Sequence, residues 1–163
     1  MEYLVRRAVF GDEGVLRALR LLALTDSPMA FSTTYEREAA RTVEDWQKWM
    51  TPGVTFLLEA DSQACGLVSC ARDASEPYVV LLRAMWVHPH MRGTGAASAL
   101  VESVKAWAVE IGATLVRLDV VENNLRARRC YEKAGFVATG RNGVVENSGD
   151  VEIEMEWKTE AKQ

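Results

Sequence analysis

The chain has 163 residues, of which 48% are hydrophobic and 26% charged, and its formal net charge is −4 with an isoelectric point near 5.3. This size suits one domain with a full apolar core, so residues 1–158 are expected to form a single domain followed by a polar tail at 159–163. The acidic balance argues against a nucleic-acid partner, because binding to phosphate backbones needs a basic surplus. No stretch approaches the roughly 20 apolar residues of a membrane helix, so no membrane partner is expected either.

Cysteine usage indicates a reducing compartment. The cysteines Cys65, Cys70 and Cys130 are odd in number and show no CxxC or Cys/His ligand spacing. A disulfide framework and a metal site are therefore not expected. Residues 1–7 lack the apolar run of a signal peptide, and we expect a cytoplasmic protein.

The first third of the chain is expected to be mostly helical after one short strand. Residues 3–8 predict a strand, and apolar residues at helical spacing predict an amphipathic helix over 12–25. Residues 29–41 show no clear pattern. Thr42 is the expected N-cap of a further short helix, which ends before Pro52. The tryptophans of this short helix suit either a core or an interface.

Strands dominate the next part of the chain. Residues 54–60 and 64–72 flank a polar turn and predict an antiparallel hairpin. Residues 78–88 form a nearly continuous apolar run, which is typical of a strand buried on both faces. The sheet therefore begins with strands that look antiparallel.

Helices and strands alternate over the remaining residues. Helices are predicted over about 95–111 and 124–134, with a strand over 114–121 between them. Two further strands, at about 136–141 and 150–158, end the domain. The order is mixed α/β, with a strand–loop–helix–strand unit at its centre.

The loop at residues 92–97 has the composition of an anion-binding turn. It contains Arg92, Gly93, Thr94, Gly95, Ala96 and Ala97. The first N–H groups of a helix lack internal partners, and the helix dipole favours an anion there. Glycines let the backbone approach a pyrophosphate closely, because no Cβ intrudes. On the glycines alone, a turn without a ligand is an equally good interpretation.

Two other phosphate loops compete with this interpretation. A P-loop is rejected because no Gly-Lys-Ser/Thr follows the glycines. A Rossmann nucleotide site has some support, since Asp119 lies near the end of the next strand, where a ribose-binding acid is expected. Against it, the third glycine is missing and residues 89–92 separate the strand from the glycines.

Two motifs together resemble the GNAT superfamily of acetyl-CoA-dependent N-acetyltransferases. Residues 92–97 look like its pyrophosphate motif, Arg/Gln-x-x-Gly-x-Gly/Ala, preceded by a Val-x-Pro that starts at Val87. The second motif places Asn124, Ala127 and Tyr131 ahead of a Gly-Phe pair. The resemblance is strongest over residues 78–140. It implies an α/β (α+β) GNAT fold: a mixed, mostly antiparallel twisted sheet of about seven strands, flanked by about four helices and splayed between strands four and five.

The resemblance also implies roles for these residues. The main chain at 92–97 is expected to hold the pyrophosphate of coenzyme A, and the backbone at Trp86 and Val87 its pantetheine arm. Asn124, Ala127 and Tyr131 share a helix face that meets the pantetheine and the sulfur.

Tyr131 is implied to protonate the departing thiolate. A phenol has a pKa near ~10 and a thiol one near ~8.5. A well-placed phenol O–H can stabilise the sulfur anion by hydrogen bonding and deliver a proton as the bond breaks. A tyrosine packed in the core is the ordinary alternative. Cys130 is expected to be a small buried thiol outside the site, because adjacent helical residues point about 100° apart.

The expected reaction is acetyl transfer to a primary amine by direct attack, with a small-molecule acceptor. Alternatives are a protein amino terminus or lysine as the acceptor, or a non-catalytic acyl-CoA-binding module. Many GNAT relatives carry a glutamate base on the fourth strand, but Arg83 and Ala84 stand there. The candidates for the base are Glu36, Glu38, Asp119, Glu122, Glu152 and Glu154. Residues 26–36 are expected either to cover the acceptor or to be a packed connector, and family analogy makes a homodimer possible.

Overall fold

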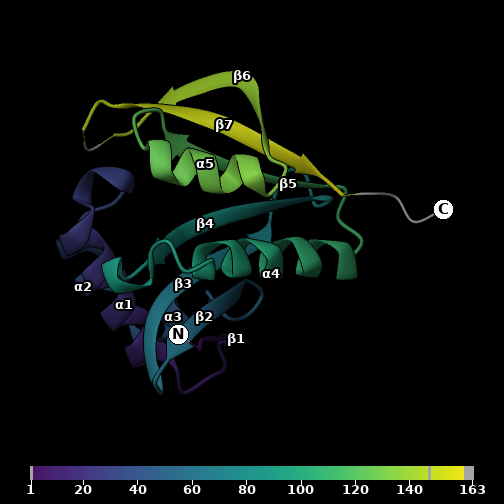
Figure 1. Ribbon diagram of the computed structural model, residues 1–163. Helices are drawn as coiled ribbons and strands as arrows, with labels where there is room; N and C mark the ends of the chain where they lie inside the picture. Colours follow the sequence, from purple (N-terminus) through teal and green to yellow (C-terminus); the bar gives the residue numbers. More distant parts are fainter. Residues whose placement is uncertain (1, 147, 160–163) are drawn as a thin grey trace.

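The computed structural model describes residues 2–146 and 148–159, which form one seven-stranded mixed sheet with the order β1-β2-β3-β4-β5-β7-β6 (Figure 1). The strands are β1 (Leu4–Arg7), β2 (Val54–Ala60), β3 (Gln63–Arg72), β4 (Val79–Val87), β5 (Leu115–Val121), β6 (Val137–Val144) and β7 (Val151–Lys158). The β4–β5 pair is parallel, and the other neighbours are antiparallel. The expected sheet is thereby confirmed.

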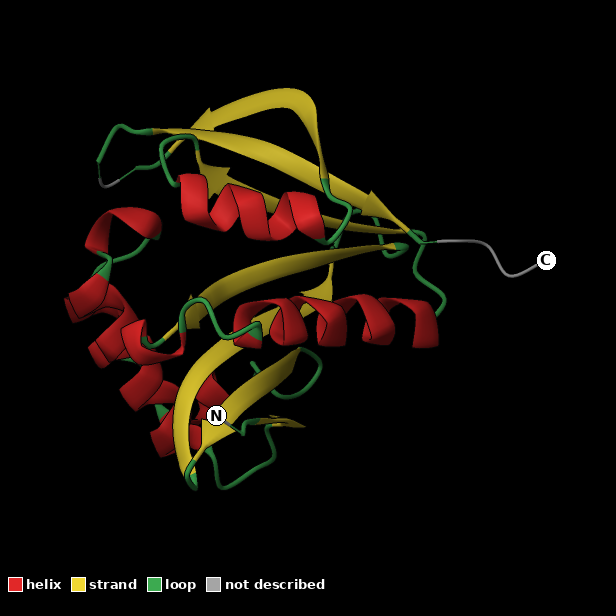
Figure 2. Cartoon of the chain, viewed as in Figure 1, coloured by secondary structure: helices red, strands yellow, loops and turns green. Residues whose placement is uncertain are grey.

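Helices cover both faces of this sheet. The α-helices of the described residues are α1 (Glu13–Asp26), α2 (Tyr35–Ala39), α3 (Val43–Gln47), α4 (Ala96–Glu110) and α5 (Leu125–Lys133), with single 3₁₀ turns η1 (Pro28–Ala30) and η2 (Pro89–Met91). Figure 2 shows the short amino-terminal helices gathered together, apart from α4 and α5. The segment 29–41, which showed no pattern in the sequence, holds most of η1 and all of α2.

Each face of the sheet has its own apolar core. On one face, α4 contributes Leu100 and Val104, which belong to the same buried cluster as Val80 and Leu82 of β4. On the other face, α1 and α3 pack against Leu57, Leu67 and Trp86, among others. Because successive strand residues point to opposite faces, one sheet can serve both cores.

The short helix α3 begins as the sequence predicts. The side chain of Thr42 accepts a hydrogen bond from the Asp45 N–H at 3.2 Å, and Asp45 Oδ2 accepts one from the Thr42 N–H at 2.9 Å. This reciprocal capping box supplies partners for two otherwise unpaired backbone donors. It orients the helix so that Trp46 is only 2% exposed. Trp46 therefore belongs to the core and not to an interface.

The sheet opens between β4 and β5. The two strands are paired only where Val79–Leu81 faces Leu115–Arg117, and they separate beyond that point. On its other side, β4 carries one extra residue relative to β3 at Ala84, which adopts φ +56°. Such a bulge bends a strand and changes which face its next side chains occupy. The bulge therefore sits where β4 departs from β5.

Three local details differ from the sequence expectations. Strand β6 runs on to Val144, beyond the expected end at 141. Helix α1, expected from residue 12, begins at Glu13, and the Asp12 carboxylate accepts hydrogen bonds from Arg6 and the Val9 N–H. Thr159, the first residue of the expected tail, is bonded to the chain at 113–114, and residues 160–163 lie outside the described residues.

Candidate active site

Two cavities meet where β4 leaves β5. The first, of about 640 Å³, lies between the loop at 92–97 and α5, and we call it the loop cavity. The second, of about 510 Å³, is bounded by α1, α2, the end of α3 and strands β3, β4, β5 and β7, and we call it the charged cavity. Both are lined by Ala30 and Phe31, so the two spaces adjoin at the segment after η1.

The floor of the loop cavity is a left-handed glycine turn at the start of α4. Gly93 has φ +80° and Gly95 has φ +88°, a region that side chains with a Cβ rarely adopt. A Cβ built on Gly93 meets no atom within 4 Å, and one on Gly95 meets only the Tyr3 hydroxyl at 3.5 Å. Gly95 is also the N-cap of α4 and offers no side-chain cap. The N–H groups of Gly93, Gly95 and Ala97 have no hydrogen-bond partner among the described residues, and all three residues line the loop cavity. They are donors that an anionic ligand can use.

Arg92 is paired within the protein. Its Nη2 lies 2.5 Å from Asp26 Oδ2, and the Trp86 indole N–H donates to the same oxygen at 3.0 Å. These two donors, Trp86 first, lower the pKa of Asp26 to about 2. The charge that the sequence assigned to the loop is thus shared with the end of α1. Sequence reasoning missed Asp26 as the partner.

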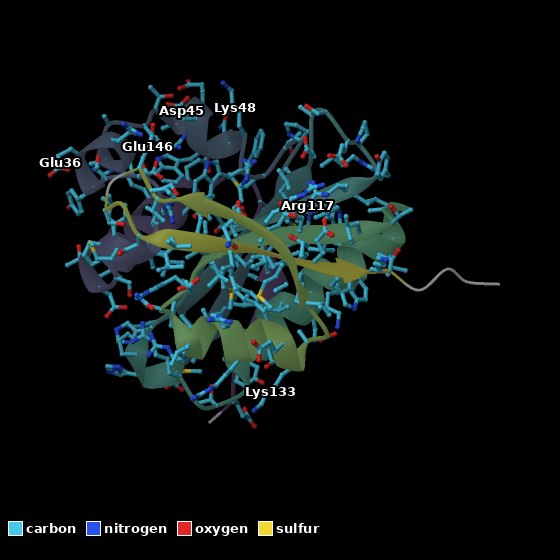
Figure 3. All side chains as sticks on the ribbon, turned by 90° about the horizontal axis from the view of Figure 1, so that it is seen from above. Glu36, Asp45, Lys48, Arg117, Lys133 and Glu146 are labelled. Carbon is cyan, nitrogen blue, oxygen red and sulfur yellow. The ribbon has the colours of Figure 1, made fainter. Side chains whose placement is uncertain are left out.

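Helix α5 forms the opposite wall of the loop cavity. Asn124 caps this helix through Oδ1, which accepts the Ala127 N–H at 3.2 Å. Cations on α5 that the motif does not include also line the cavity, namely Arg126, Arg129 and Lys133, the last labelled in Figure 3. They suit a ligand that carries several negative charges.

Tyr131 lies in the wall of the loop cavity and is only 6% exposed. Its ring packs edge-on against Phe136, with centroids 5.8 Å apart. Burial raises the pKa of the phenol, so Tyr131 keeps its proton at neutral pH. No side chain or backbone group of the described residues is hydrogen-bonded to its hydroxyl, which leaves the O–H free to donate to a ligand.

The expectation for Cys130 is wrong in one respect. Its thiol is only partly buried, and the residue lines the same cavity as Tyr131. The cavity follows α5 over two turns, so neighbouring helical positions both reach its wall. Burial raises the pKa of the Cys130 thiol, which makes it a poor nucleophile at neutral pH.

The structure brings most of the sequence-predicted residues into one cavity. Those that line it are Trp86, Val87, Arg92, Gly93, Gly95, Ala97, Asn124, Ala127 and Tyr131. Two loop residues do not line it: Ala96 is buried beneath the first turn of α4, and the Thr94 hydroxyl donates to the Met91 carbonyl at 2.5 Å. The Thr94 N–H also donates to the Met91 carbonyl at 3.4 Å and the Ala96 N–H to the Thr94 hydroxyl at 3.3 Å, so these two residues shape the turn.

A buried ion cluster forms one wall of the charged cavity. Glu38 is 1% exposed, and its two carboxylate oxygens accept hydrogen bonds from Arg20, at 3.1 Å, and from Arg41. The Arg20 guanidinium also lies over the Phe31 ring, 4.6 Å from its centroid. With both oxygens occupied, Glu38 is not available to accept a proton from a substrate.

The opposite wall carries two acids with a different environment. Burial and the nearby Glu154 raise the pKa of Asp119 on β5, and burial and Asp119 raise the pKa of Glu152 on β7. Arg117, which Figure 3 labels, lies beside them and forms ion pairs with Glu156 at 2.7 Å, with Glu76 and with Glu154.

Only some of the candidate bases reach a cavity. Asp119, Glu152 and the occupied Glu38 line the charged cavity. Three others line neither space: Glu36 points outward from α2 in Figure 3, Glu122 is exposed, and Glu154 is bonded by Thr139. Sequence spacing does not show which of these acids line a cavity, because the elements that carry them come together only in the fold.

Two negative findings apply to residues 2–146 and 148–159. No group of three or more His, Cys, Asp or Glu side chains is arranged to hold a metal ion. No helix combines the length and the apolar content that a membrane span requires.

The mixed sheet opens beside a glycine turn at a helix N-terminus. This arrangement is typical of acetyltransferases that use an acyl-CoA. The profile of the acetyltransferase (GNAT) family matches residues 18–136, and the chain belongs to this family. Its largely antiparallel sheet and this membership rule out the Rossmann alternative.

Known proteins and structures agree with this membership. An uncharacterised N-acetyltransferase of Mycobacterium tuberculosis is 44% identical over 61 residues, which span 37% of this chain and only 39% of that relative. A GNAT-family acetyltransferase from Streptococcus pneumoniae has the same fold, with a TM-score of 0.83 at 22% identity over 98% of this chain and all of that one. A Salmonella typhimurium protein solved with its cofactor acetyl-CoA gives a TM-score of 0.80 at 15% identity, over 100% of this chain and 97% of that one.

Proposed function

We propose that this protein transfers the acetyl group of acetyl-CoA to a primary amine by direct attack in a ternary complex, with a small molecule as the acceptor. The observation that carries the proposal is the loop cavity itself. It joins an open glycine turn at a helix N-terminus to a buried tyrosine whose hydroxyl is free, and it adjoins a second cavity that can hold an acceptor. Family membership and the acetyl-CoA of the Salmonella neighbour support the choice of cosubstrate.

The main chain at 92–97 binds the diphosphate in this proposal. Its donors belong to a turn that only glycine adopts easily, at the positive end of α4. Arg126, Arg129 and Lys133 line the same space and add charge for the remaining phosphate oxygens. The pantetheine arm follows β4 at Trp86 and Val87, with Asn124 and Ala127 along its other side.

Tyr131 donates a proton to the sulfur. The amine attacks the thioester carbonyl, the C–S bond breaks, and the thiolate that leaves takes the phenolic proton. The newly acetylated nitrogen then loses its excess proton, which restores the phenol of Tyr131. Burial keeps the phenol protonated before this step, and the newly formed thiolate is the strongest nearby acceptor. Direct attack needs no covalent enzyme intermediate, in agreement with the raised pKa of Cys130.

Asp119 accepts the proton of the acceptor ammonium, with Glu152 as its neighbour in the same cavity. An alkylammonium must lose its proton before it attacks. A carboxylate with a raised pKa is a better base than an ordinary one, and both acids line the charged cavity beside the point where β4 leaves β5. In this proposal Asp119 and Glu152 take the role of the fourth-strand glutamate of many relatives, because this chain has Arg83 at that place.

The deciding experiment incubates the protein with acetyl-CoA and a panel of amines and measures free thiol. We expect thiol release that depends on both substrates and that Tyr131→Phe largely abolishes. Acetyl-CoA binding without thiol release from any amine would favour the non-catalytic module instead. Release with peptides or lysine side chains, but with no small amine, would favour a protein acceptor. The single domain over 1–158, a homodimer and the cytoplasmic location remain predictions.

A further inference from the structure

The charged cavity contains a buried cation with an unused donor. The side chain of Arg20 is 9% exposed and its Nε bonds Glu38, yet its Nη1 is buried with no hydrogen-bond partner among the described residues. Buried donors are almost always paired, because leaving one unpaired costs the hydration it gave up. Arg20 lines the cavity, so a ligand oxygen is the natural partner for this N–H.

A second cation on the same side, Arg83, lies outside every ion pair of the described residues. It reaches the charged cavity from β4. Glu38 does not neutralise it, because Arg20 and Arg41 occupy both carboxylate oxygens of Glu38. Burial raises the pKa of Asp119, and the charge of Arg83 acts across the cavity to lower it. The α1 and β4 side of the cavity therefore carries more positive than negative charge.

The β5 and β7 side carries the opposite charge. Asp119 and Glu152 line this wall, and neither takes part in an ion pair of the described residues. The nearest cation on their own strands, Arg117, is shared by three glutamates. The cavity is thus polarised, with an excess of cations on one wall and two carboxylates outside any described ion pair on the other.

From this arrangement we infer that the acceptor is a small amine that also carries a carboxylate, as an amino acid does. Arg20 Nη1 and Arg83 hold the carboxylate, and Asp119 with Glu152 holds the ammonium group and removes its proton. An amine without an anionic group would leave the donors of Arg20 and Arg83 without an acceptor in the bound complex. This inference rests on the proposed acetyl transfer and adds the class of acceptor.

Matched acceptors test the inference. Each amino acid that is acetylated is compared with its decarboxylated amine and with its carboxamide, by thiol release and by calorimetric binding to the protein saturated with coenzyme A. We expect kcat/KM to fall at least ~100-fold for both analogues, because each loses the charge-assisted hydrogen bonds to the arginines.

Variants of Arg83 and Arg20 test which side chains recognise the carboxylate of the acceptor. Arg83→Gln should raise KM for the amino acid about 10-fold or more, affect the decarboxylated amine far less, and leave acetyl-CoA affinity unchanged. Arg20→Lys keeps a cation beside Glu38 and removes the free Nη1 donor, so it should act in the same direction if the fold is retained. Arg37→Gln, an exposed site on α2 outside both cavities, is the charge-matched control.

The outcomes separate this inference from the proposed function. Equal kcat/KM for an amino acid and its decarboxylated amine would overturn the inference and leave acetyl transfer intact. An Arg83→Gln variant that weakens both acceptors equally would overturn it in the same way. If no amine releases thiol, acetyl transfer fails; tighter binding of the amino acid than of its decarboxylated analogue would then still support the charge assignment, and equal binding would refute it.

Discussion

The loop cavity and the charged cavity are built in opposite ways. The loop cavity takes much of its wall from one stretch of chain, β4 through the start of α4, and from consecutive residues of α5. The charged cavity draws single side chains from several elements that are distant in sequence, such as Arg20 of α1, Arg83 of β4 and Glu152 of β7. The proposed cosubstrate site is therefore formed largely by residues that are close in the sequence. The proposed acceptor site is formed by residues that only the fold brings together.

The recognition chemistry explains this difference. A phosphate group can be held by backbone N–H groups, so the loop needs only a conformation, which glycine at 93 and 95 permits. A charged acceptor needs side chains of chosen sign at chosen points, and any strand or helix that reaches the cavity can supply them. Only the first requirement leaves a fixed spacing in the sequence.

Replacing Gly95 by valine should have the largest effect, because it disturbs the backbone conformation on which the loop cavity depends. A β-branched residue at φ +88° is strained, and its side chain would enter the space above the turn. We expect acetyl-CoA affinity to fall by more than ~100-fold, or about 2.7 kcal/mol, by calorimetry. Gly140→Val tests a glycine with φ +90° on β6, away from both cavities, and should keep full affinity. Equal losses in the two variants would contradict a role for Gly95 at the ligand.

Tyr131→Phe should separate chemistry from binding in the loop cavity. Without the phenolic proton the thiolate leaves unprotonated, so kcat should fall roughly 100-fold while acetyl-CoA affinity changes little. Stopped-flow thiol detection and calorimetry measure the two quantities. Tyr35→Phe, an exposed tyrosine on α2, should be neutral. Full turnover by Tyr131→Phe would move the proton donor to another group.

Asp119→Asn tests the acidic wall of the charged cavity. Asp119 acts as a base only when ionised, and its pKa lies above 3.8, so kcat/KM should fall as the pH drops through that raised value. The substitution should lower kcat/KM by about 30-fold and remove this acidic limb.

A second variant checks the origin of the acidic limb. Glu154 raises the pKa of Asp119, so Glu154→Gln should shift the limb to lower pH without abolishing activity. Measured pH–rate profiles decide both points. A limb that survives unchanged in Asp119→Asn would assign the base elsewhere.

The smallest effect is expected for Asp26→Asn, which cuts the link between α1 and the pyrophosphate loop. The folded pKa of Asp26 is about 2, below its ordinary value of 3.8, so its contribution to stability is present above about pH 4 and disappears as the pH falls to about 2. The variant should melt a few degrees lower at pH 7 and as the parent does near pH 2. Glu36→Gln, at an exposed site, should not change the melting temperature at either pH. A difference that persists at pH 2 would contradict the role of the ionised carboxylate.

Some features of this fold are predictable because they depend on near neighbours in the chain. Helical spacing located α1, α4 and α5, and Thr42 as an N-cap located α3. The apolar run of β4 and the hairpin of β2 and β3 followed from patterns of a few residues. The segment 29–41 gave no signal, because η1 and α2 are each shorter than two helical turns and depend on contacts such as that of Glu38 with Arg20.

The side chains that interact in the two cavities come from residues far apart in the sequence. The pair of Arg92 and Asp26 joins positions 66 apart, and Asp119 meets Glu152 only because β7 pairs with β5. The extra residue at Ala84 that turns Arg83 and Trp86 to one face comes from register against β3, which no pattern within β4 reveals. Local conformational preference was enough to indicate the cosubstrate loop and the family. The charged groups that choose an acceptor were brought together by packing and strand pairing, because electrostatic complementarity depends on distance in space and not on distance along the chain.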